Sequence, residues 1–269
     1  MPFRVTGMKW HRIRAILWQE LFVVYRSGEV ITDIVVFPLA HIVVFGFISL
    51  YLSAENPEAG QLVLVGMLLW QVIWIIEYAV TLGSLWNIWS RNLTNLFITP
   101  LRLPEYIAAH TLSGIVKALV ILGIGALLSA YVFDFNLLDV GILPLTLAFL
   151  NFALFSFAMG VAILGFIFRY GTRIQAVAWG AVTLFQPLTA AFYPVEVMPT
   201  ILQYIAYLFP ATYTFEAVRY ALLNNGEVAW NLFGIAFAEN IFYCIVCTLA
   251  FVSMYNTSRD TGQFARNEA

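Results

Sequence analysis

The sequence predicts an all-α, polytopic membrane protein, on the evidence of its composition and of the lengths of its apolar runs. Of 269 residues, 62% are hydrophobic and only 10% are charged, whereas a soluble domain has roughly 45–50% apolar and about 25% charged residues. The mean hydropathy is +0.86. One buried core could not hold this apolar excess, so the composition excludes a soluble enzyme, a disordered chain and a nucleic-acid-binding protein, which needs charge.

Six apolar stretches are long enough to cross a bilayer, whose hydrocarbon core of about 30 Å requires ~20 apolar residues per helix. They are residues 30–52, 62–86, 106–131, 142–168, 174–192 and 231–255. We therefore predict a six-helix transmembrane domain (29–255) between an N-terminal arm (1–28) and a C-terminal tail (256–269).

The positions of the basic residues predict the orientation of these helices. Most of the 13 Lys and Arg residues lie in the arm, the tail, the connection between the second and third stretches, and the connection between the fourth and fifth. Lys and Arg are retained on the cytoplasmic side during insertion. We therefore expect both termini to be cytoplasmic, in a bacterial-type plasma membrane.

Residues 9–26 of the arm predict an amphipathic helix on the cytoplasmic membrane surface, because their apolar residues recur at helical spacing. The alternative is a basic topology signal with no further role. The apolar residues are Trp10, Ile13, Leu17, Leu21 and Val24.

A second segment, 193–227, is too apolar for an exposed loop and is interrupted by three prolines, Pro194, Pro199 and Pro210. The halves 200–208 and 212–223 are each too short to span, and irregular backbone at membrane depth must be buried in protein. We predict a re-entrant helical hairpin on the outer side. The alternative, one extra span plus a surface helix, would invert the tail and break the charge alternation.

The sequence contains no recognisable catalytic or metal-ligating constellation. Its three histidines lie far apart, and Cys244 and Cys247 lie in an apolar stretch without a second ligand pair. With only two lysines, Lys9 and Lys117, the chain has no phosphate-binding loop for ATP. We therefore expect no catalytic residue, no metal and no cofactor bound by this chain.

Besides Asp33 and Glu239, two charged residues, Glu77 and Lys117, fall inside predicted spans, where a charge costs about 2.5–3.5 kcal/mol at a helix centre. Their spans run antiparallel with an axial offset below ~10 Å. The favoured interpretation is a Glu77–Lys117 pair that joins two helices. The alternative is a polar patch lining a transport path between subunits.

Two motifs together resemble the type-2 permease family of ATP-binding-cassette (ABC) exporters. The connection after the second stretch reads RNLTNLFITP (91–100). The outer segment contains Phe192-Tyr193-Pro194, Met198-Pro199, Phe209-Pro210, Thr212-Tyr213 and Glu216 followed by Arg219.

The resemblance implies a homodimer docked on two cytoplasmic ABC ATPase subunits, which bind ATP and Mg²⁺. The loop 87–105 then carries a coupling helix, and the outer hairpin closes the path. For coupling to the ATPase we expect Arg91, Leu93, Leu96, Phe97, Thr99 and Pro100, together with Trp10 and Arg14. For the transport path or its gate we expect Glu77, Lys117, Phe192, Tyr193, Tyr213, Glu216 and Arg219.

The function expected from this resemblance is outward transport, without enzymatic activity of this chain, of a lipid, hydrophobic drug-like or lipid-linked substrate. We expect the chain to contact membrane lipids and to bind no nucleic acid. A polysaccharide exporter, for O-antigen or teichoic-acid-like chains, is the alternative within the family. An ion-coupled secondary transporter is the alternative of another class.

Overall fold

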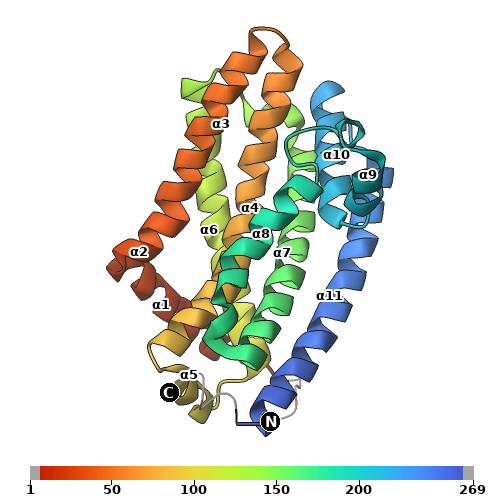
Figure 1. Ribbon diagram of the computed structural model, residues 1–269. Helices are drawn as coiled ribbons and strands as arrows, with labels where there is room; N and C mark the ends of the chain where they lie inside the picture. The colour runs from red at the N-terminus through yellow and green to blue at the C-terminus, as the bar shows by residue number, and fades with distance from the viewer. Residues whose placement is uncertain (1–6, 263–269) are drawn as a thin grey trace.

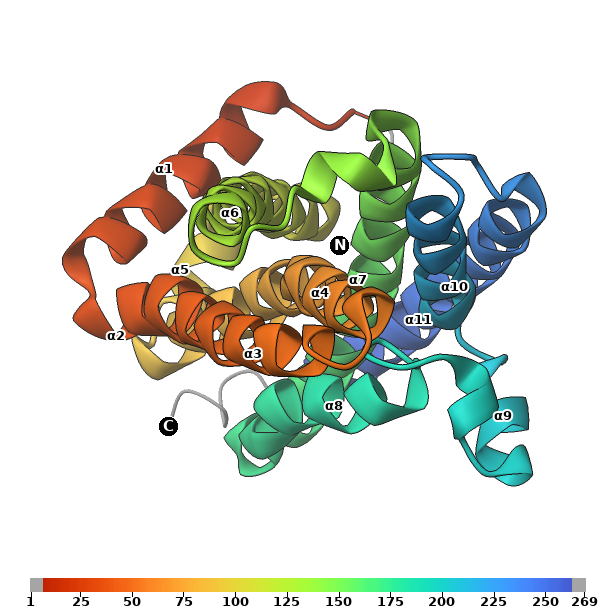
Figure 2. The same ribbon diagram turned by 90° about the horizontal axis from the view of Figure 1, so that it is seen from above.

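The computed structural model describes residues 7–262, and the regular secondary structure in that range is all helical, in agreement with the predicted fold class. The side chains of Leu93, Thr94, Phe97, Thr172, Arg173, Gln175 and Trp179 lie outside the description. The helices form one bundle with α4 at its centre, surrounded by α3, α6, α7 and α8 (Figures 1 and 2).

Five segments in the described part of the chain are long and apolar enough to cross a membrane. The first combines α2, a π-helical turn η1 and α3, and the other four are single helices. They agree with five of the six predicted stretches. Their bounds are α2 (Gly28–Ile31), η1 (Thr32–Val36), α3 (Phe37–Ser53), α4 (Pro57–Trp89), α6 (Leu103–Val132), α7 (Ile142–Tyr170) and α11 (Trp230–Asp260).

The sixth predicted stretch forms a shorter helix, α8 (Gln175–Leu188), after a 3₁₀ turn η3 (Gly171–Ile174). Its 14 residues rise roughly 21 Å, less than the ~30 Å of a hydrocarbon core. The helix passes through Pro187 and ends where Ala190 adopts a left-handed conformation with φ of 52°. The backbone then turns away before residue 192.

The predicted hairpin contains two helices, as its prolines indicated. They are α9 (Thr200–Ala206) and α10 (Pro210–Leu223), preceded by a 3₁₀ turn η4 (Val195–Val197). The longer helix α10 packs against α7 and α11 and is largely buried, whereas α9 lies at the edge of the bundle (Figure 2).

Close helix contacts hold α4 between α6 and α7. A Cβ added to Gly114 of α6 would lie 2.9 Å from the Cα of Ile76, and one added to Gly160 of α7 would lie 2.9 Å from the Cβ of Val80. Only glycine permits such approaches, because any side chain would overlap the neighbouring helix. The central helix is therefore tightly packed on two sides.

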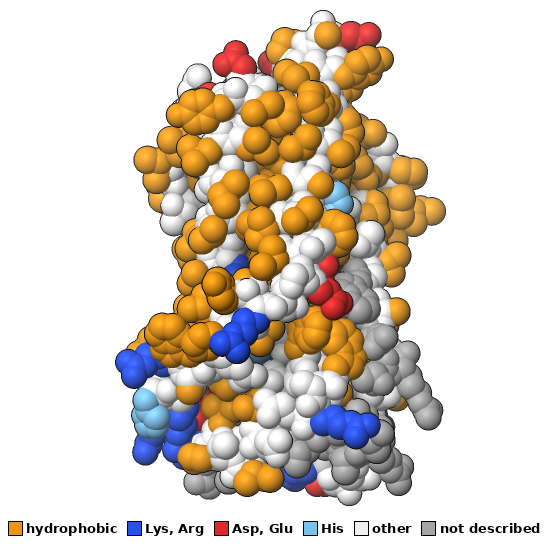
Figure 3. Space-filling view, turned by 90° about the vertical axis from the view of Figure 1, so that its left-hand side faces the viewer, with side chains coloured by type: hydrophobic (Ala, Val, Ile, Leu, Met, Phe, Trp, Pro, Cys, Tyr) orange, Lys and Arg blue, Asp and Glu red, His pale blue; other side chains and the backbone are white. Residues whose placement is uncertain are grey.

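The two ends of the bundle differ in charge. One end, here the basic end, is formed by α1 (Trp10–Arg26), α5 (Leu93–Ile98) and the last turns of α7 and α11. The other, here the hairpin end, carries the end of α10, the turn η2 (Leu137–Val140) and the α3–α4 connection. On the face shown in Figure 3, most Lys and Arg side chains gather at the basic end, and hydrophobic side chains cover the middle.

Candidate functional site

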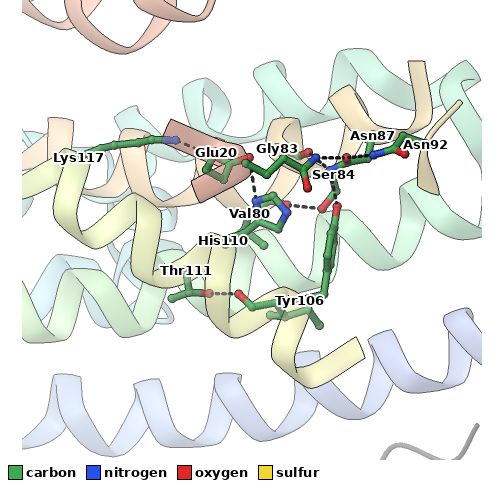
Figure 4. A network of polar contacts seen from close by, with 12 residues as sticks. Glu20, Val80, Gly83, Ser84, Asn87, Asn92, Tyr106, His110, Thr111 and Lys117 are labelled. Carbon is green, nitrogen blue, oxygen red and sulfur yellow. Dashed lines mark hydrogen bonds and ion pairs between the residues drawn. The ribbon is translucent and has the colours of Figure 1, made fainter. Parts of the chain in front are cut away.

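The predicted amphipathic helix is present as α1 and packs along α6, to which it is joined by a buried carboxylate (Figures 2 and 4). Lys117 Nζ donates a hydrogen bond of 2.8 Å to Glu20 Oε2, and His110 Nδ1 lies 3.4 Å from Glu20 Oε1. Glu20 follows Ile13 and Ile16 on the buried face of α1, so the fold of this amphipathic helix directs its carboxylate into the protein.

The surroundings of Glu20 keep this carboxylate charged. Burial by itself would raise the pKa of Glu20, but His110 and Lys117 outweigh that effect and hold the pKa below its ordinary value. An ionised Glu20 beside a lysine forms a charge-assisted hydrogen bond, which is about twice as strong as a neutral one. The contact between α1 and α6 is therefore electrostatic as well as apolar.

The predicted Glu77–Lys117 pair is wrong, because Lys117 is bound to Glu20 instead. Glu77 is only 2% exposed, and its Oε1 atom has no hydrogen-bond partner among the described residues. The prediction considered only residues within spans, and the stronger partner of Lys117 lies outside them, on α1. The described structure thus places these two predicted path residues in different environments.

A second set of polar contacts extends from α1 into α4. Gln19 Nε2 donates to Asn87 Oδ1 at 2.8 Å. Asn87 Nδ2 in turn donates to the Tyr106 hydroxyl at 3.0 Å (Figure 4). The ring of Tyr106 meets that of His110 edge to face, with centroids 4.4 Å apart. Three helices, α1, α4 and α6, therefore share one network of buried polar side chains.

Glu105 joins the start of α1 to the start of α6. Its Oε1 accepts the backbone N–H of Lys9 at 2.9 Å, and its Oε2 accepts the backbone N–H of Arg102 at 2.8 Å and lies 3.4 Å from Arg12 Nη1. The side chain of Glu105 is fully buried. Because Glu105 immediately follows the connection that contains α5, it links that connection to α1 as well.

The predicted coupling segment forms the short helix α5 and a turn after it. Leu96 packs against the protein, whereas Ile98 is 78% exposed and Thr99 and Pro100 are also exposed. A groove of about 370 Å³ lies between this segment and α1. It is lined by His11, Arg12, Ala15, Ile16, Gln19, Leu96, Thr99, Pro100 and Leu101.

The other residues predicted for coupling lie near the same surface. Trp10 and Arg14 are exposed on α1, and Arg91 is exposed before α5 with φ of 54°. The side chains of Leu93 and Phe97 lie outside the described residues. The described residues predicted for coupling thus lie at the basic end, and three of them, Leu96, Thr99 and Pro100, line the groove.

At the hairpin end, Arg219 connects α10 to the segment that follows α8. Arg219 Nη1 donates to the Ala190 carbonyl at 2.8 Å, and its Nη2 donates to Glu216 Oε1 at 2.7 Å. The same Glu216 oxygen accepts the backbone N–H of Val195 at 3.1 Å. The structure thus brings two of the predicted gate residues together as a clamp on residues 190–195.

The remaining predicted gate residues surround this clamp without contacting each other as one group. Phe192 packs on Phe45 of α3 with ring centroids 4.7 Å apart, and the Tyr193 hydroxyl donates to the Pro187 carbonyl at 2.8 Å. Tyr213 instead contacts the ring of Tyr207, 5.4 Å away. The aromatic side chains thus fasten the hairpin to α3, to α8 and to itself.

Sequence reasoning missed Glu20, Glu105 and Asn87. A signal for Glu20 was present, because this acidic residue falls on the apolar face of an amphipathic helix, where an unpaired charge is costly. Nothing comparable marked Asn87 or Glu105, which lie near the ends of long apolar helices.

These features define a multi-pass helical membrane protein with a helix packed along its basic end and two short helices, α9 and α10, before its last long helix. Residues 11–223 match the family model for the ABC-2 type transporter. The chain belongs to this family, the transmembrane subunits of type-2 ABC transporters, which have no ATPase site of their own and normally pair with an ABC ATPase subunit. No curated protein matches the chain.

Proposed function

We propose that this chain is the permease subunit of an ABC exporter and moves a lipid, hydrophobic or lipid-linked substrate outward. The observation that carries the proposal is the groove at the basic end. It lies between α1 and α5, and Glu105 and Glu20 fasten both of its sides to α6. A partner that pushes on this groove therefore acts directly on a membrane-spanning helix.

The proposed arrangement places the basic end in the cytoplasm, with both termini there, because Lys and Arg residues favour that side. In a bacterial-type plasma membrane, two copies of the chain pair as a homodimer on two ATPase subunits, which hold ATP and Mg²⁺. The helix α8 then acts as a short sixth span. The hairpin α9–α10 re-enters the membrane from the outer side, where the Arg219 clamp holds the path closed.

Reconstitution with the partner ATPase tests this proposal. The chain is expressed together with the ABC ATPase of its own organism, purified as a complex and placed in liposomes that contain candidate lipids or lipid-linked glycans. We expect ATP hydrolysis to be stimulated by one of these substrates and inhibited by vanadate. Transfer of that substrate to the opposite leaflet should require ATP.

Three results would contradict all or part of the proposal. If no ABC ATPase of that organism co-purifies with the chain, ATP hydrolysis cannot drive transport through it. Substrate movement that is driven by a proton or sodium gradient without ATP would instead identify an ion-coupled secondary transporter. Stimulation by a water-soluble glycan without a lipid anchor would replace the lipid substrate with a polysaccharide.

A further inference from the structure

A narrow apolar groove runs along α7 between α8 and α11, on the face of the bundle seen in Figure 1. Its volume is about 300 Å³, at the lower end of the range of about 300–1,000 Å³ for pockets that hold small ligands. Side chains from all three helices line it, among them Phe155, Ala162, Phe166, Val177, Ala181 and Cys247.

The dimensions of the groove suit one extended hydrocarbon chain. From Phe155 to Phe166 the lining extends roughly 16 Å along α7, about half of the ~30 Å hydrocarbon core and therefore the depth of one leaflet. Its volume over that length corresponds to a mean cross-section of roughly 20 Å². An α-helix with side chains, ~10–12 Å in diameter, is far too wide to enter.

The two ends of the groove differ. Towards the hairpin end it is closed by Phe209, whose ring meets that of Phe185 edge to face at 5.1 Å, and by Tyr243, whose hydroxyl is bound to the Leu208 carbonyl. Towards the basic end the lining stops at Phe166 and Val177, which are 41% and 42% exposed. A chain whose polar head stays at this exposed end therefore lies with its tip pointing to the hairpin end.

A positively charged side chain, that of Arg169, lies beyond the exposed end of the groove. Arg169 lies two helical turns after Ala162, on the same face of α7 as the groove. Its guanidinium lies 5.7 Å from the ring centre of Tyr170, which stacks on Phe166. Within the part of the chain that the structure describes, Arg169 forms no ion pair. A positive charge is thus available where the head of an amphiphile would lie.

We propose that this groove binds one acyl chain of an anionic phospholipid of the cytoplasmic leaflet, with the phosphate of its headgroup against Arg169. The assignment of the leaflet rests on the orientation proposed above. Cytoplasmic leaflets are rich in anionic lipids, and a lipid in that leaflet points its chain from the basic end towards the middle of the bundle. The width of the groove, its apolar lining and the charge of Arg169 therefore all fit an anionic phospholipid in this one orientation.

Native mass spectrometry of the purified full-length chain tests the site without the ATPase. The chain is titrated with phosphatidylglycerol or with phosphatidylcholine of identical acyl chains. We expect phosphatidylglycerol to bind more tightly by roughly five-fold, the effect of one Arg near an anionic surface. Arg169→Gln should abolish this preference and leave phosphatidylcholine binding unchanged. Ala162→Phe, which fills the groove, should weaken the binding of both lipids.

Matched controls separate the groove from general effects of charge and bulk. Arg26→Gln removes another arginine that lies over an aromatic ring, that of Phe22, but far from the groove. Ala238→Phe adds the same bulk to an exposed position on the opposite face of α11 from Cys247. Both should bind lipid like the unaltered chain. If Ala162→Phe fails to fold, Cys247→Phe fills the groove from α11.

Three results would overturn the proposal. Equal affinity of the unaltered chain for the two lipids would show that Arg169 does not bind the anionic headgroup. Undiminished lipid binding by both groove-filling variants would place the lipid elsewhere. Dissociation of a dimer by these variants without any change in lipid binding would assign the groove to contact with a second copy. Because no ATPase is present, a failure of the proposed export function would leave this binding result unaffected.

Discussion

Lys117 on α6 donates a hydrogen bond to Glu20 on α1 across 2.8 Å, although 97 residues separate the two in the chain. We predict that Lys117→Met lowers the free energy of unfolding by about 3 kcal/mol, because it leaves a buried carboxylate without its lysine. Thermal unfolding of the purified chain in detergent measures the change.

The double variant Glu20→Gln with Lys117→Met should be more stable than Lys117→Met alone, because no buried charge is left unpaired. Additive losses from the two single substitutions would show that the pair contributes nothing to the contact between α1 and α6.

The stability of the α1–α6 contact should depend on pH through Glu20. The folded protein holds the pKa of Glu20 below the ordinary value of 4.5. The stabilisation is therefore fully present above 4.5 and is lost as the pH falls through the lower, folded value. Thermal unfolding followed from neutral to acidic pH should show a loss in that window that is smaller in Glu20→Gln. An identical acid profile for both proteins would exclude Glu20 as its source.

Gly83 is required by the polar network, because a Cβ at this position would lie 2.6 Å from His110 Nδ1. Gly83→Ala should therefore destabilise the protein by about 1–3 kcal/mol, the usual effect of overpacking. Gly123→Ala on α6 is the matched control, since its Cβ would meet nothing within 4 Å among the described residues. That control should be neutral or stabilising by up to ~1 kcal/mol, as for any Gly→Ala change inside a helix. Equal thermal midpoints for the two variants would contradict the prediction.

Among the described side chains of α5, Ile98 is the exposed apolar one, and its substitution tests ATPase docking directly. Ile98→Asp should reduce co-purification with the ATPase about ten-fold, equivalent to the loss of ~1.4 kcal/mol at a docking surface, and should leave folding unchanged. Leu96→Asp is less informative, because Leu96 also packs against the protein. Ile201→Asp at the hairpin end, where the side chain is 75% exposed against 78% for Ile98, should not affect co-purification. Loss of the ATPase from both variants would point to a general defect.

Arg219→Lys should loosen the segment that follows α8. A lysine has one ammonium group and cannot bind the Ala190 carbonyl and Glu216 together in the forked geometry of a guanidinium. Hydrogen exchange at the Val195 amide should become faster by about ten-fold or more, corresponding to a loss of ~1.4 kcal/mol of local stability. Arg259→Lys, in an exposed pair with Asp260, is the control. An unchanged exchange rate of the Val195 amide in Arg219→Lys would show that Arg219 does not hold this segment in place.

The predictable part of the fold depends on local pattern. Long apolar runs predicted α4, α6, α7 and α11, the stripe that includes Ile13 and Leu17 predicted α1, and the prolines divided the hairpin correctly. The length of α8 was overestimated, because the apolar run continues beyond Leu188 while the backbone turns at Ala190. Hydropathy alone does not report such a turn.

The candidate site was less predictable than the fold. Thr99 and Pro100 were predicted for coupling from a local motif; the structure places them beside α1, and their coupling role stays a prediction. The pairing of Lys117 with Glu20 depends on how α1 crosses α6, which is a matter of tertiary packing. The prediction paired Lys117 with Glu77 because both lie in neighbouring antiparallel spans. In the structure, the partner of Lys117 is Glu20 of α1.

The long separation between Glu20 and its partners has a consequence for biosynthesis. Glu20 and the rest of α1 leave the ribosome before α6 exists, so the first helix has no lysine or histidine partner until His110 and Lys117 have been translated. Until then the favourable place for its carboxylate is water at the membrane surface. The docking of α1 thus marks the moment at which the third long helix has been inserted, and a nascent chain that stops before α6 should leave α1 open to proteases and chaperones.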